Sequence, residues 1–411
     1  MIDFEMSPTI ENARQMIHMM AEQTMRPIAR EYDEREHEDP VDWHEMMWSV
    51  SKGSEMVFGG KADKKGEKKE KGPSERFLSS AVTIEELSWG DAGLYLSIPN
   101  PGLGGAAVAA AGTPEQRKRF LARFQEGKPK WAAMAITEPG AGSDSAAITA
   151  TAVRDGDHWV LNGNKIFCTS GERALEKSDG FVVVWATVDK SAGRAGIKAF
   201  VVEAGTPGVH VTKVEDKLGI RASDTAQIVL EDCRIPLDNL LGSAAVEKES
   251  TEGFKGVMAT FDATRPAVAA SALGIGRAAL DFVCEALAKA GVTIRYDAPY
   301  SKLTALERDY MEMEANLQAA RLLTWRAAWM MDRGMHNNLE ASMCKAKAGL
   351  AVTQVTQKAV EILGPLGYSR QLLLEKWMRD AKINDIFEGT QQINLMIVAR
   401  RILGYSSKEL N

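Results

Sequence analysis

The chain has 411 residues, of which 45% are hydrophobic and 26% are charged, and its formal net charge is −6. This composition is typical of a globular protein with two or three structural units. The acidic balance argues against nucleic-acid binding, and we expect no signal peptide and no apolar run long enough to span a bilayer. The four cysteines form no CxxC pair, so we expect reduced thiols, no metal site and a bacterial cytoplasmic location.

The N-terminal third is predicted to be helical. A stretch with helical apolar spacing begins at Ser7 and continues to Ile28. Further on, Thr113 and Gln116 can form a capping box at a second helix start. The lysine-rich stretch 61–72 predicts a solvated loop, with a basic arm that steers an anionic ligand or partner as the alternative.

The middle of the chain, from Trp131 to Gly242, has a β pattern. Short runs rich in β-branched residues alternate with glycine-containing turns. These runs are 148–153, 158–169, 180–188, 197–202, 208–214 and 226–230. Their length and spacing predict a compact antiparallel β-barrel.

The last part of the chain returns to helical periodicity. Four long segments carry it, at 263–290, 305–332, 339–363 and 391–403. Their lengths predict an antiparallel four-helix bundle. We therefore expect an α+β protein with three domains, at residues 1–130, 131–243 and 244–411.

A glycine-rich loop stands at the start of the β region, within residues 135–144. Gly140 and Gly142 allow a tight turn with converging backbone N–H groups, and Thr137 and Ser143 add hydroxyl donors. Such a cradle favours a pyrophosphate. Because the loop does not open a helix, a Rossmann-type site is not expected.

The end of one predicted strand carries a second candidate feature. Phe167 and Thr169 share a face under strand alternation, so an aromatic ring and a hydroxyl could cover and hydrogen-bond a flavin ring. The alternative is a core phenylalanine with a structural threonine.

A carboxylate near the C-terminus is the candidate base. Glu388 follows two apolar residues, and burial there would raise its pKa, as suits a proton acceptor. The alternative is an acid that caps the helix predicted from Gln391. Arg265 could meet a ligand phosphate or orient the polar network of the site, or it could simply pair with Asp262.

Taken together, these segments resemble the acyl-CoA dehydrogenase family over nearly the whole chain. Residues 134–144 are similar to its first signature, 218–225 with 229–236 to a β-domain stretch, and 378–383 with 388–390 to its C-terminal signature. The resemblance implies a helical domain, a β-barrel and a four-helix bundle, usually assembled as a tetramer.

The resemblance also implies a reaction. Glu388 would remove the pro-R α-proton of an acyl-CoA thioester, and the β-hydrogen would leave as hydride to N5 of FAD. The Glu388 backbone N–H and a flavin ribityl hydroxyl would polarise the thioester carbonyl. An electron-transferring flavoprotein would take the electrons. The trans-2-enoyl-CoA is the implied product of this step of fatty-acid β-oxidation.

Site residues carry over by position. The resemblance implies flavin contacts from Met134, Ile136, Thr137, Gly142, Ser143, Phe167, Thr169 and Thr390. It implies substrate contacts from Ser143, Phe261, Arg265, Phe387 and Gly389. Met134 stands where the family often has an aromatic residue, and Phe387 where many members have tyrosine. The acyl group itself, whether straight, branched or derived from a steroid side chain, is left open.

Two departures from the family pattern fall on the half-site that serves a neighbouring subunit. Residues 292–300 lack the family's Arg-x-x-Phe-Gly motif, and its Gln-x-x-Gly-Gly is replaced by a segment with Glu361 and Pro365. Glu361 adds negative charge, and Pro365 removes a backbone donor. A partner chain in an α2β2 heterotetramer could supply the missing contacts, with a homotetramer as the alternative.

Two other functions remain as alternatives. One is a different flavin enzyme on the same fold, such as a monooxygenase or a nitroalkane oxidase relative. The other is a non-catalytic subunit that completes another chain's site.

Overall fold

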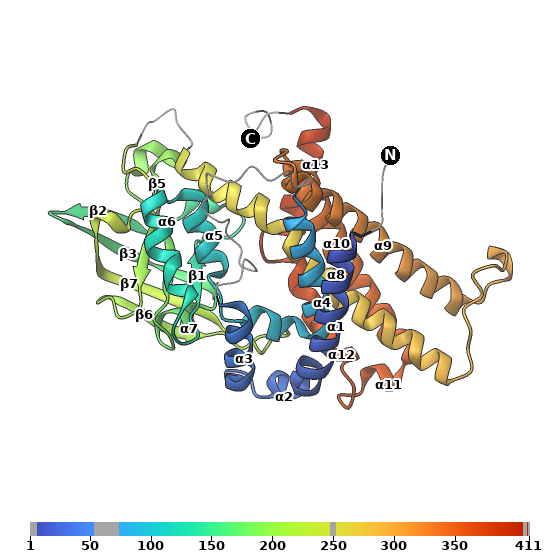
Figure 1. The fold of residues 1–411 in the computed structure, drawn as a ribbon. Coiled ribbons are helices and arrows are strands. Elements are labelled where there is room, and N and C mark those ends of the chain that lie inside the picture. The colour runs from blue at the N-terminus through green and yellow to red at the C-terminus, as the bar shows by residue number, and fades with distance from the viewer. Residues whose placement is uncertain (1–5, 53–73, 247–251, 406–408, 410–411) are drawn as a thin grey trace.

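Three groups of elements follow one another along the chain (Figure 1). The computed structural model describes residues 6–52, 74–246, 252–405 and 409, with the backbone alone between 252 and 262. The lysine-rich stretch 61–72 and the side chain of Phe261 therefore lie outside the described residues.

The N-terminal group is helical, as its spacing predicts. Ser7 caps the first helix, and Thr113 and Gln116 form the expected capping box, with Gln116 N donating to Thr113 Oγ1 (3.2 Å) and Thr113 N to Gln116 Oε1 (2.9 Å). The helices are α1 (Pro8–Met20), α2 (Ala29–Glu34), α3 (Val41–Ser51), α4 (Arg76–Ser97), α5 (Gly102–Ala111) and α6 (Pro114–Leu121).

The middle group is one seven-stranded sheet. Its strands are β1 (Ala132–Ala135), β2 (Thr151–Asp155), β3 (His158–Thr169), β4 (Phe181–Thr187), β5 (Ile197–Glu203), β6 (Val209–Val214) and β7 (Thr225–Pro236). The order is β1-β4-β2-β3-β7-β6, and β5 pairs with β4. Most pairings are antiparallel as predicted, but β4 pairs in parallel with β1 and, at one residue, with β2.

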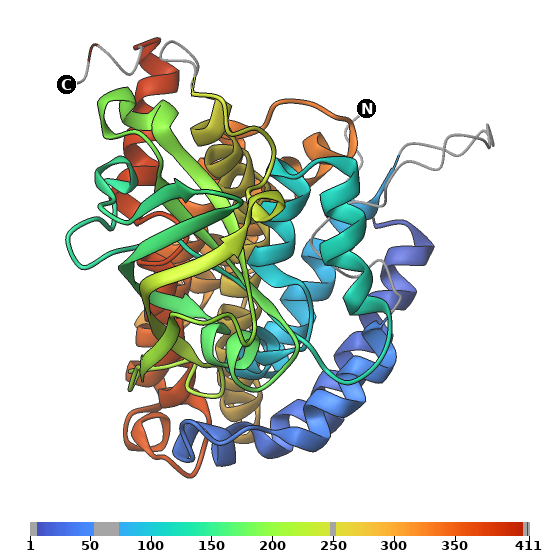
Figure 2. The ribbon, with the colours of Figure 1, turned by 90° about the vertical axis from the view of Figure 1, so that its left-hand side faces the viewer.

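The unpredicted strand β1 explains the parallel pairing. The chain enters the sheet from the helical group, and Ala132 to Ala135 align with Phe181 to Val184 of β4. Every residue of β4 is buried, because one of its faces lies in the core of the sheet and the other packs on α5 and α6. Figure 2 shows these helices beside the sheet. A strand buried on both faces reads as a continuous apolar run.

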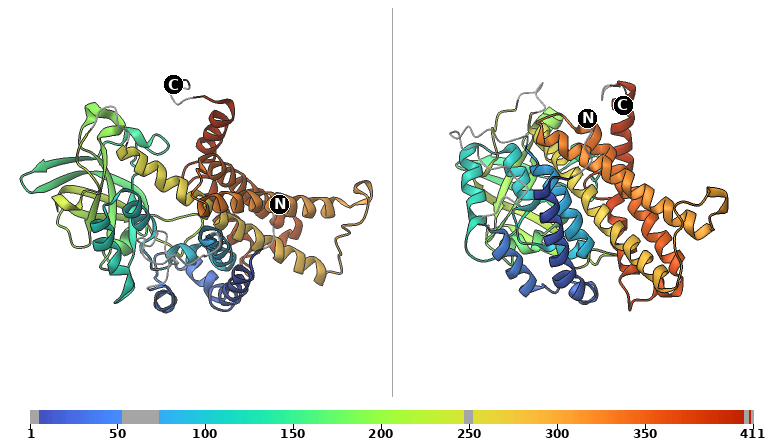
Figure 3. Two further views of the ribbon diagram at one scale, coloured as in Figure 1. Left: turned by 45° about the horizontal axis from the view of Figure 1, so that its top comes forward. Right: turned by 45° about the vertical axis from the view of Figure 1, so that its right-hand side comes forward.

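The C-terminal group is the helix bundle. It consists of α8 (Glu252–Lys289), α9 (Ala305–Asp332), α10 (Asn338–Leu363), α11 (Pro365–Tyr368), α12 (Leu374–Ala381) and α13 (Gln391–Leu403). Helix α8 begins well before the predicted start and continues through Pro266. The connection between α8 and α9 projects from one end of the bundle (Figure 3).

One helix in the described part of the chain is long and apolar enough to cross a membrane. It is the segment Ala263–Lys289 of α8, so the expectation that no apolar run reaches this length is wrong. However, 67% of the apolar window is buried inside the protein. The reason for the apolar composition is that α8 packs against α4, α9 and α10 at the centre of the bundle.

Candidate active site

The glycine-rich loop is held by a buried ion pair. Lys165 Nζ on β3 lies 2.7 Å from Glu138 Oε1 and donates to the Ile136 carbonyl at 3.1 Å. Glu138 also accepts bonds from Thr149 N (2.6 Å), Thr149 Oγ1 (2.7 Å) and Ala150 N (2.9 Å). Burial works against its charge, but these donors outweigh it and lower the pKa of Glu138. These hydrogen bonds therefore fix the main chain at residues 136–138.

The two glycines of the loop, Gly140 and Gly142, face open space. Glu138 and Ala141 exchange backbone hydrogen bonds around the turn, and Gly142 and Ser143 are exposed. A Cβ at Gly140 or Gly142 would meet no atom within 4 Å, so the loop leaves room for a ligand beside its backbone.

Met134 and Ile136 differ from the other candidate flavin residues. Both side chains are buried in the core between the sheet and the N-terminal helices. A contact from either residue to a cofactor would therefore come from its main chain.

Phe167 stands at an irregularity in β3. Between Lys165 and Cys168 the register against β7 shifts, and Phe167 has φ +59°, a left-handed conformation that costs a non-glycine residue free energy. Its side chain is 60% exposed, Thr169 is half-buried, and Cys168 between them is buried. An aromatic ring held outward on strained backbone is a feature of binding sites. A backbone hydrogen bond from Ile166 N to Thr137 O (2.9 Å) joins this region to the loop.

Glu388 lies in the turn between α12 and α13. Its φ is +55° and that of Gly389 is +88°, so two consecutive residues are left-handed. Thr264 Oγ1 on α8 donates to Glu388 Oε2 at 2.9 Å. Burial raises the pKa of Glu388, although Thr264 and the nearby cations Arg265 and Lys345 act in the opposite direction.

The alternative role for Glu388, as a helix cap, does not fit this geometry. Thr390 is the cap of α13, because its side chain accepts the bond from Ile393 N at 3.3 Å. The carboxylate of Glu388 instead faces Thr264 on another helix. The hydroxyl oxygen of Thr390 is thus already engaged as an acceptor in its own helix.

The remaining candidate substrate residues surround the same turn. Arg265 is buried on α8, and its Nη1 lies 3.4 Å from Ser342 Oγ on α10. Phe387 is half-buried directly before Glu388.

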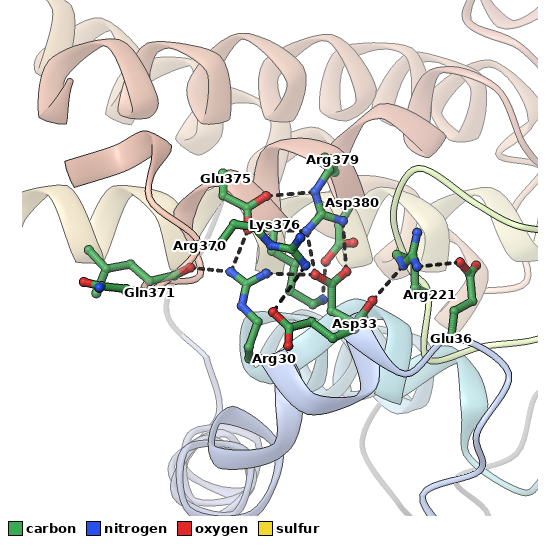
Figure 4. Close-up of polar contacts among 12 residues, drawn as sticks. Arg30, Asp33, Glu36, Arg221, Arg370, Gln371, Glu375, Lys376, Arg379 and Asp380 are labelled. Carbon is green, nitrogen blue, oxygen red and sulfur yellow. Dashed lines mark hydrogen bonds and ion pairs between the residues drawn. The ribbon is translucent and has the colours of Figure 1, made fainter. Parts of the chain in front are cut away.

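A network of ion pairs fixes α12, the helix that precedes Glu388 (Figure 4). Arg379 on α12 pairs with Asp33 of α2, with Nη2 and Oδ2 2.6 Å apart. Lys376 pairs with Asp380 (2.6 Å), whose other oxygen accepts the backbone N–H of Ile220 from the sheet domain at 2.6 Å. Because a buried charge without its partner costs several kcal/mol, the network favours one placement of α12 relative to the other two domains.

Sequence reasoning missed several residues of this site. Thr264, Lys345 and Asn394 all contact the turn at residues 388–390, and Glu138 with Lys165 supports the loop. One signal was available: Lys345 stands among small apolar residues on the buried face of α10, where an isolated lysine is unusual.

The site residues fall into two groups with different chemistry. An open glycine loop, an outward aromatic ring and a half-buried threonine are suited to a flavin nucleotide, and a carboxylate with a raised pKa stands on the bundle. These are features that a flavin-dependent oxidoreductase requires.

Models of one protein family match all three parts of the chain. The models of the acyl-CoA dehydrogenase N-terminal, middle and C-terminal domains match residues 7–128, 133–233 and 251–403. The short-chain specific mitochondrial acyl-CoA dehydrogenase of Bos taurus is 38% identical over 405 residues, 97% of this chain and 91% of that protein.

Solved structures of similar proteins have the same fold. Butyryl-CoA dehydrogenase from Megasphaera elsdenii is 32% identical, with a TM-score of 0.82 over 98% of this chain and 100% of that one. A chain in the structure of the electron transferring flavoprotein of Acidaminococcus fermentans is 33% identical, with a TM-score of 0.81 over 98% and 100%. The chain belongs to the acyl-CoA dehydrogenase family, and it is an oxidoreductase that uses FAD to dehydrogenate acyl-CoA thioesters.

Proposed function

We propose that the chain removes the α- and β-hydrogens of a short-chain acyl-CoA, with Glu388 as the base, to give the trans-2-enoyl-CoA. The single observation that supports the base most strongly is its setting. Glu388 is the carboxylate of the C-terminal signature, its pKa is raised by burial, and it bonds to Thr264 rather than capping a helix. A base must be ionised at working pH and basic enough to accept a proton: burial makes Glu388 more basic, while Thr264, Arg265 and Lys345 favour its ionised form.

The proposed reaction uses a carbanion-like transition state at the α-carbon. Glu388 accepts the α-proton at a carboxylate oxygen, and its own backbone N–H is a candidate donor to the thioester carbonyl. FAD, when bound, supplies the acceptor for the hydride that leaves the β-carbon. The left-handed φ of +55° at Glu388 is consistent with a backbone that the surrounding structure holds in place for this purpose.

We assign the cofactor and substrate contacts to two groups of residues. The sheet domain would hold FAD through Thr137, Gly142, Ser143, Phe167 and Thr169, with main-chain contacts from Met134 and Ile136. The bundle would contribute Thr390 to FAD, and Arg265, Phe387 and Gly389 to the substrate. Ser143 would face both ligands.

The relatives suggest the substrate and the electron acceptor. One similar protein is named for short-chain substrates, another for butyryl-CoA, and a third similar chain comes from a structure of an electron transferring flavoprotein. We therefore propose a short straight acyl chain, and an electron-transferring flavoprotein as the partner that reoxidises the enzyme.

The direct test is anaerobic bleaching of the bound flavin by acyl-CoAs of increasing chain length. Butyryl-CoA should bleach it fastest. Glu388→Gln should slow bleaching by roughly 10²–10⁴-fold, the usual contribution of a general base. Glu312→Gln, at an exposed acid on α9, is the matched control. A Glu388→Gln variant that bleaches at the normal rate would disprove the assignment, and rapid reoxidation by O2 would favour the oxygen-using alternative.

A heteromeric assembly is a second proposal, favoured by one contact. Arg295, the arginine in the stretch that lacks the family motif, is already held in a bidentate pair with Glu307 (2.6 and 2.7 Å). Glu361 is exposed, and Pro365 opens α11 directly after α10. A partner chain would then supply the contacts that this half-site lacks. One FAD per chain in a pure homotetramer would refute this arrangement and support the homomeric one.

A further inference from the structure

Helix α10 carries a face that holds the segment leading to Glu388. Gly349 lies against this segment so closely that a Cβ there would come within 2.8 Å of the Asn384 carbonyl oxygen. One turn further on, Thr353 Oγ1 lies 3.2 Å from Asp385 Oδ2. One turn earlier is Lys345, so the three residues recur every four positions and share one face.

Lys345 reaches the turn itself. Its side chain is buried, and Nζ donates to the Gly389 carbonyl at 2.7 Å. The buried side chain of Asn394 donates to the same carbonyl at 2.9 Å and to the Thr390 carbonyl at 3.0 Å. A lysine ammonium is expensive to bury, so a lysine whose hydrogen-bonded acceptor is a backbone carbonyl requires a reason to be there.

The position of that carbonyl supplies the reason. Gly389 directly follows Glu388, and both residues are left-handed. A left-handed conformation is unfavourable for a non-glycine residue and persists only where its surroundings hold it. A charged hydrogen bond to the Gly389 carbonyl fixes the Gly389–Thr390 peptide plane, and so holds the left-handed turn from the residue directly after Glu388.

We propose that Lys345 is a positioning residue for Glu388: its buried ammonium anchors the Gly389 carbonyl, keeps the base in its left-handed conformation and provides a cation that favours the carboxylate form. This inference rests on the proposed role of Glu388 as the base. Lys345 acts through Glu388 and the turn, and it touches neither proton nor hydride.

The charges around the pair set the expected pH dependence. Arg265 of α8 and Lys345 of α10 face Glu388, while Glu388, Asp385 and Arg265 face Lys345. Burial lowers the pKa of Lys345 to about 8, against the opposing effect of the two carboxylates. At pH 7 the ammonium form prevails. Removing this cation makes the carboxylate of Glu388 less favourable, so the acidic limb of the rate profile should move to higher pH.

The experiment measures the anaerobic rate of flavin bleaching by butyryl-CoA between pH 6 and pH 10. Lys345→Met removes both the hydrogen-bond donor and the charge. We expect a rate loss of roughly 10- to 100-fold at pH 7, which is the cost of a misplaced reacting group. The acidic limb of the rate profile should also shift to higher pH. Lys345→Gln keeps an N–H donor without the charge, so it should recover part of the rate and retain the shift. Lys347→Met, on the same helix at a half-buried lysine, is the control and should match the wild type.

The outcomes separate the two proposals. Suppose that butyryl-CoA bleaches the wild type and that Glu388→Gln is inactive. If a folded, flavin-loaded Lys345→Met then has the wild-type rate and pH profile, the role of Lys345 is refuted and that of Glu388 stands. If no acyl-CoA bleaches the flavin-loaded wild type, both fall. Should Lys345→Met fail to accumulate, Lys345→Gln decides by the same criteria, and an unshifted profile at the wild-type rate overturns the inference.

Discussion

The buried ion pair between Lys165 and Glu138, which supports the glycine-rich loop, offers a quantitative test of how the sheet domain supports the cofactor. Lys165→Met removes the bonds to Glu138 (2.7 Å) and to the Ile136 carbonyl (3.1 Å) and leaves a carboxylate that is only 3% exposed. Breaking a buried ion pair from one side costs about 3–5 kcal/mol. Because Glu138 keeps three hydrogen bonds, from Thr149 and Ala150, we expect the low end, about 3 kcal/mol.

That loss can be measured as a change in Tm. An unfolding entropy of about 2.1 cal/mol/K per residue gives roughly 0.9 kcal/mol/K for 411 residues, so a loss of about 3 kcal/mol lowers the Tm by about 3–4 °C. The measurement should use the apoprotein, since bound FAD would itself shift the Tm. In parallel, the Kd for FAD should rise about tenfold, which corresponds to about 1.4 kcal/mol, because Ile136 loses its anchor.

The double variant Lys165→Met with Glu138→Gln is the decisive control. It removes both charges together, so it should be more stable than Lys165→Met alone, and the two changes should not be additive. Additive losses would show that the pair is not coupled. An unchanged Kd for FAD in a destabilised Lys165→Met would refute the link between this pair and the loop.

Three further predictions concern single side chains. Burial lowers the pKa of His44 to about 3, so as the pH falls below the unfolded value of about 6.5 only the unfolded chain gains the proton. Stability should therefore fall by about 1.6 kcal/mol between pH 6.5 and pH 5. In urea unfolding, His44→Gln should lack this part of the acid sensitivity. Phe167→Asn should leave the Tm of the apoprotein equal or higher, because asparagine tolerates the left-handed backbone, but should weaken FAD binding, and unaltered binding would argue against a ring contact. Thr264→Val removes a hydrogen bond to the carboxylate form of Glu388, so the acidic limb of flavin bleaching should move to higher pH, and an unmoved limb would contradict that contact.

Much of the local structure could be predicted from the sequence. Helix α9 spans 305–332 and α13 spans 391–403 as their apolar periodicity predicts, and strand β3 has its predicted bounds. The capping box at Thr113 forms because its two partners lie three residues apart. Glu388 could be named as a candidate base from its apolar neighbours, but the sequence left a helix-capping role open, and only the contact with Thr264 on another helix argues against that role.

The tertiary structure decided what depends on residues distant in the sequence. Strand β1 is only four residues long, and its identity comes from β4, almost fifty positions away. The apolar stretch in α8 is a core helix because three other helices bury it. The sequence places Lys345 on a helix and Glu388 in a loop, but only the packing of α10 at Gly349 brings that ammonium to the Gly389 carbonyl, 44 residues further along. Periodicity and capping are local properties that the sequence determines by itself, whereas the raised pKa and the orientation of Glu388 arise from non-local contacts and therefore exist only in the folded protein.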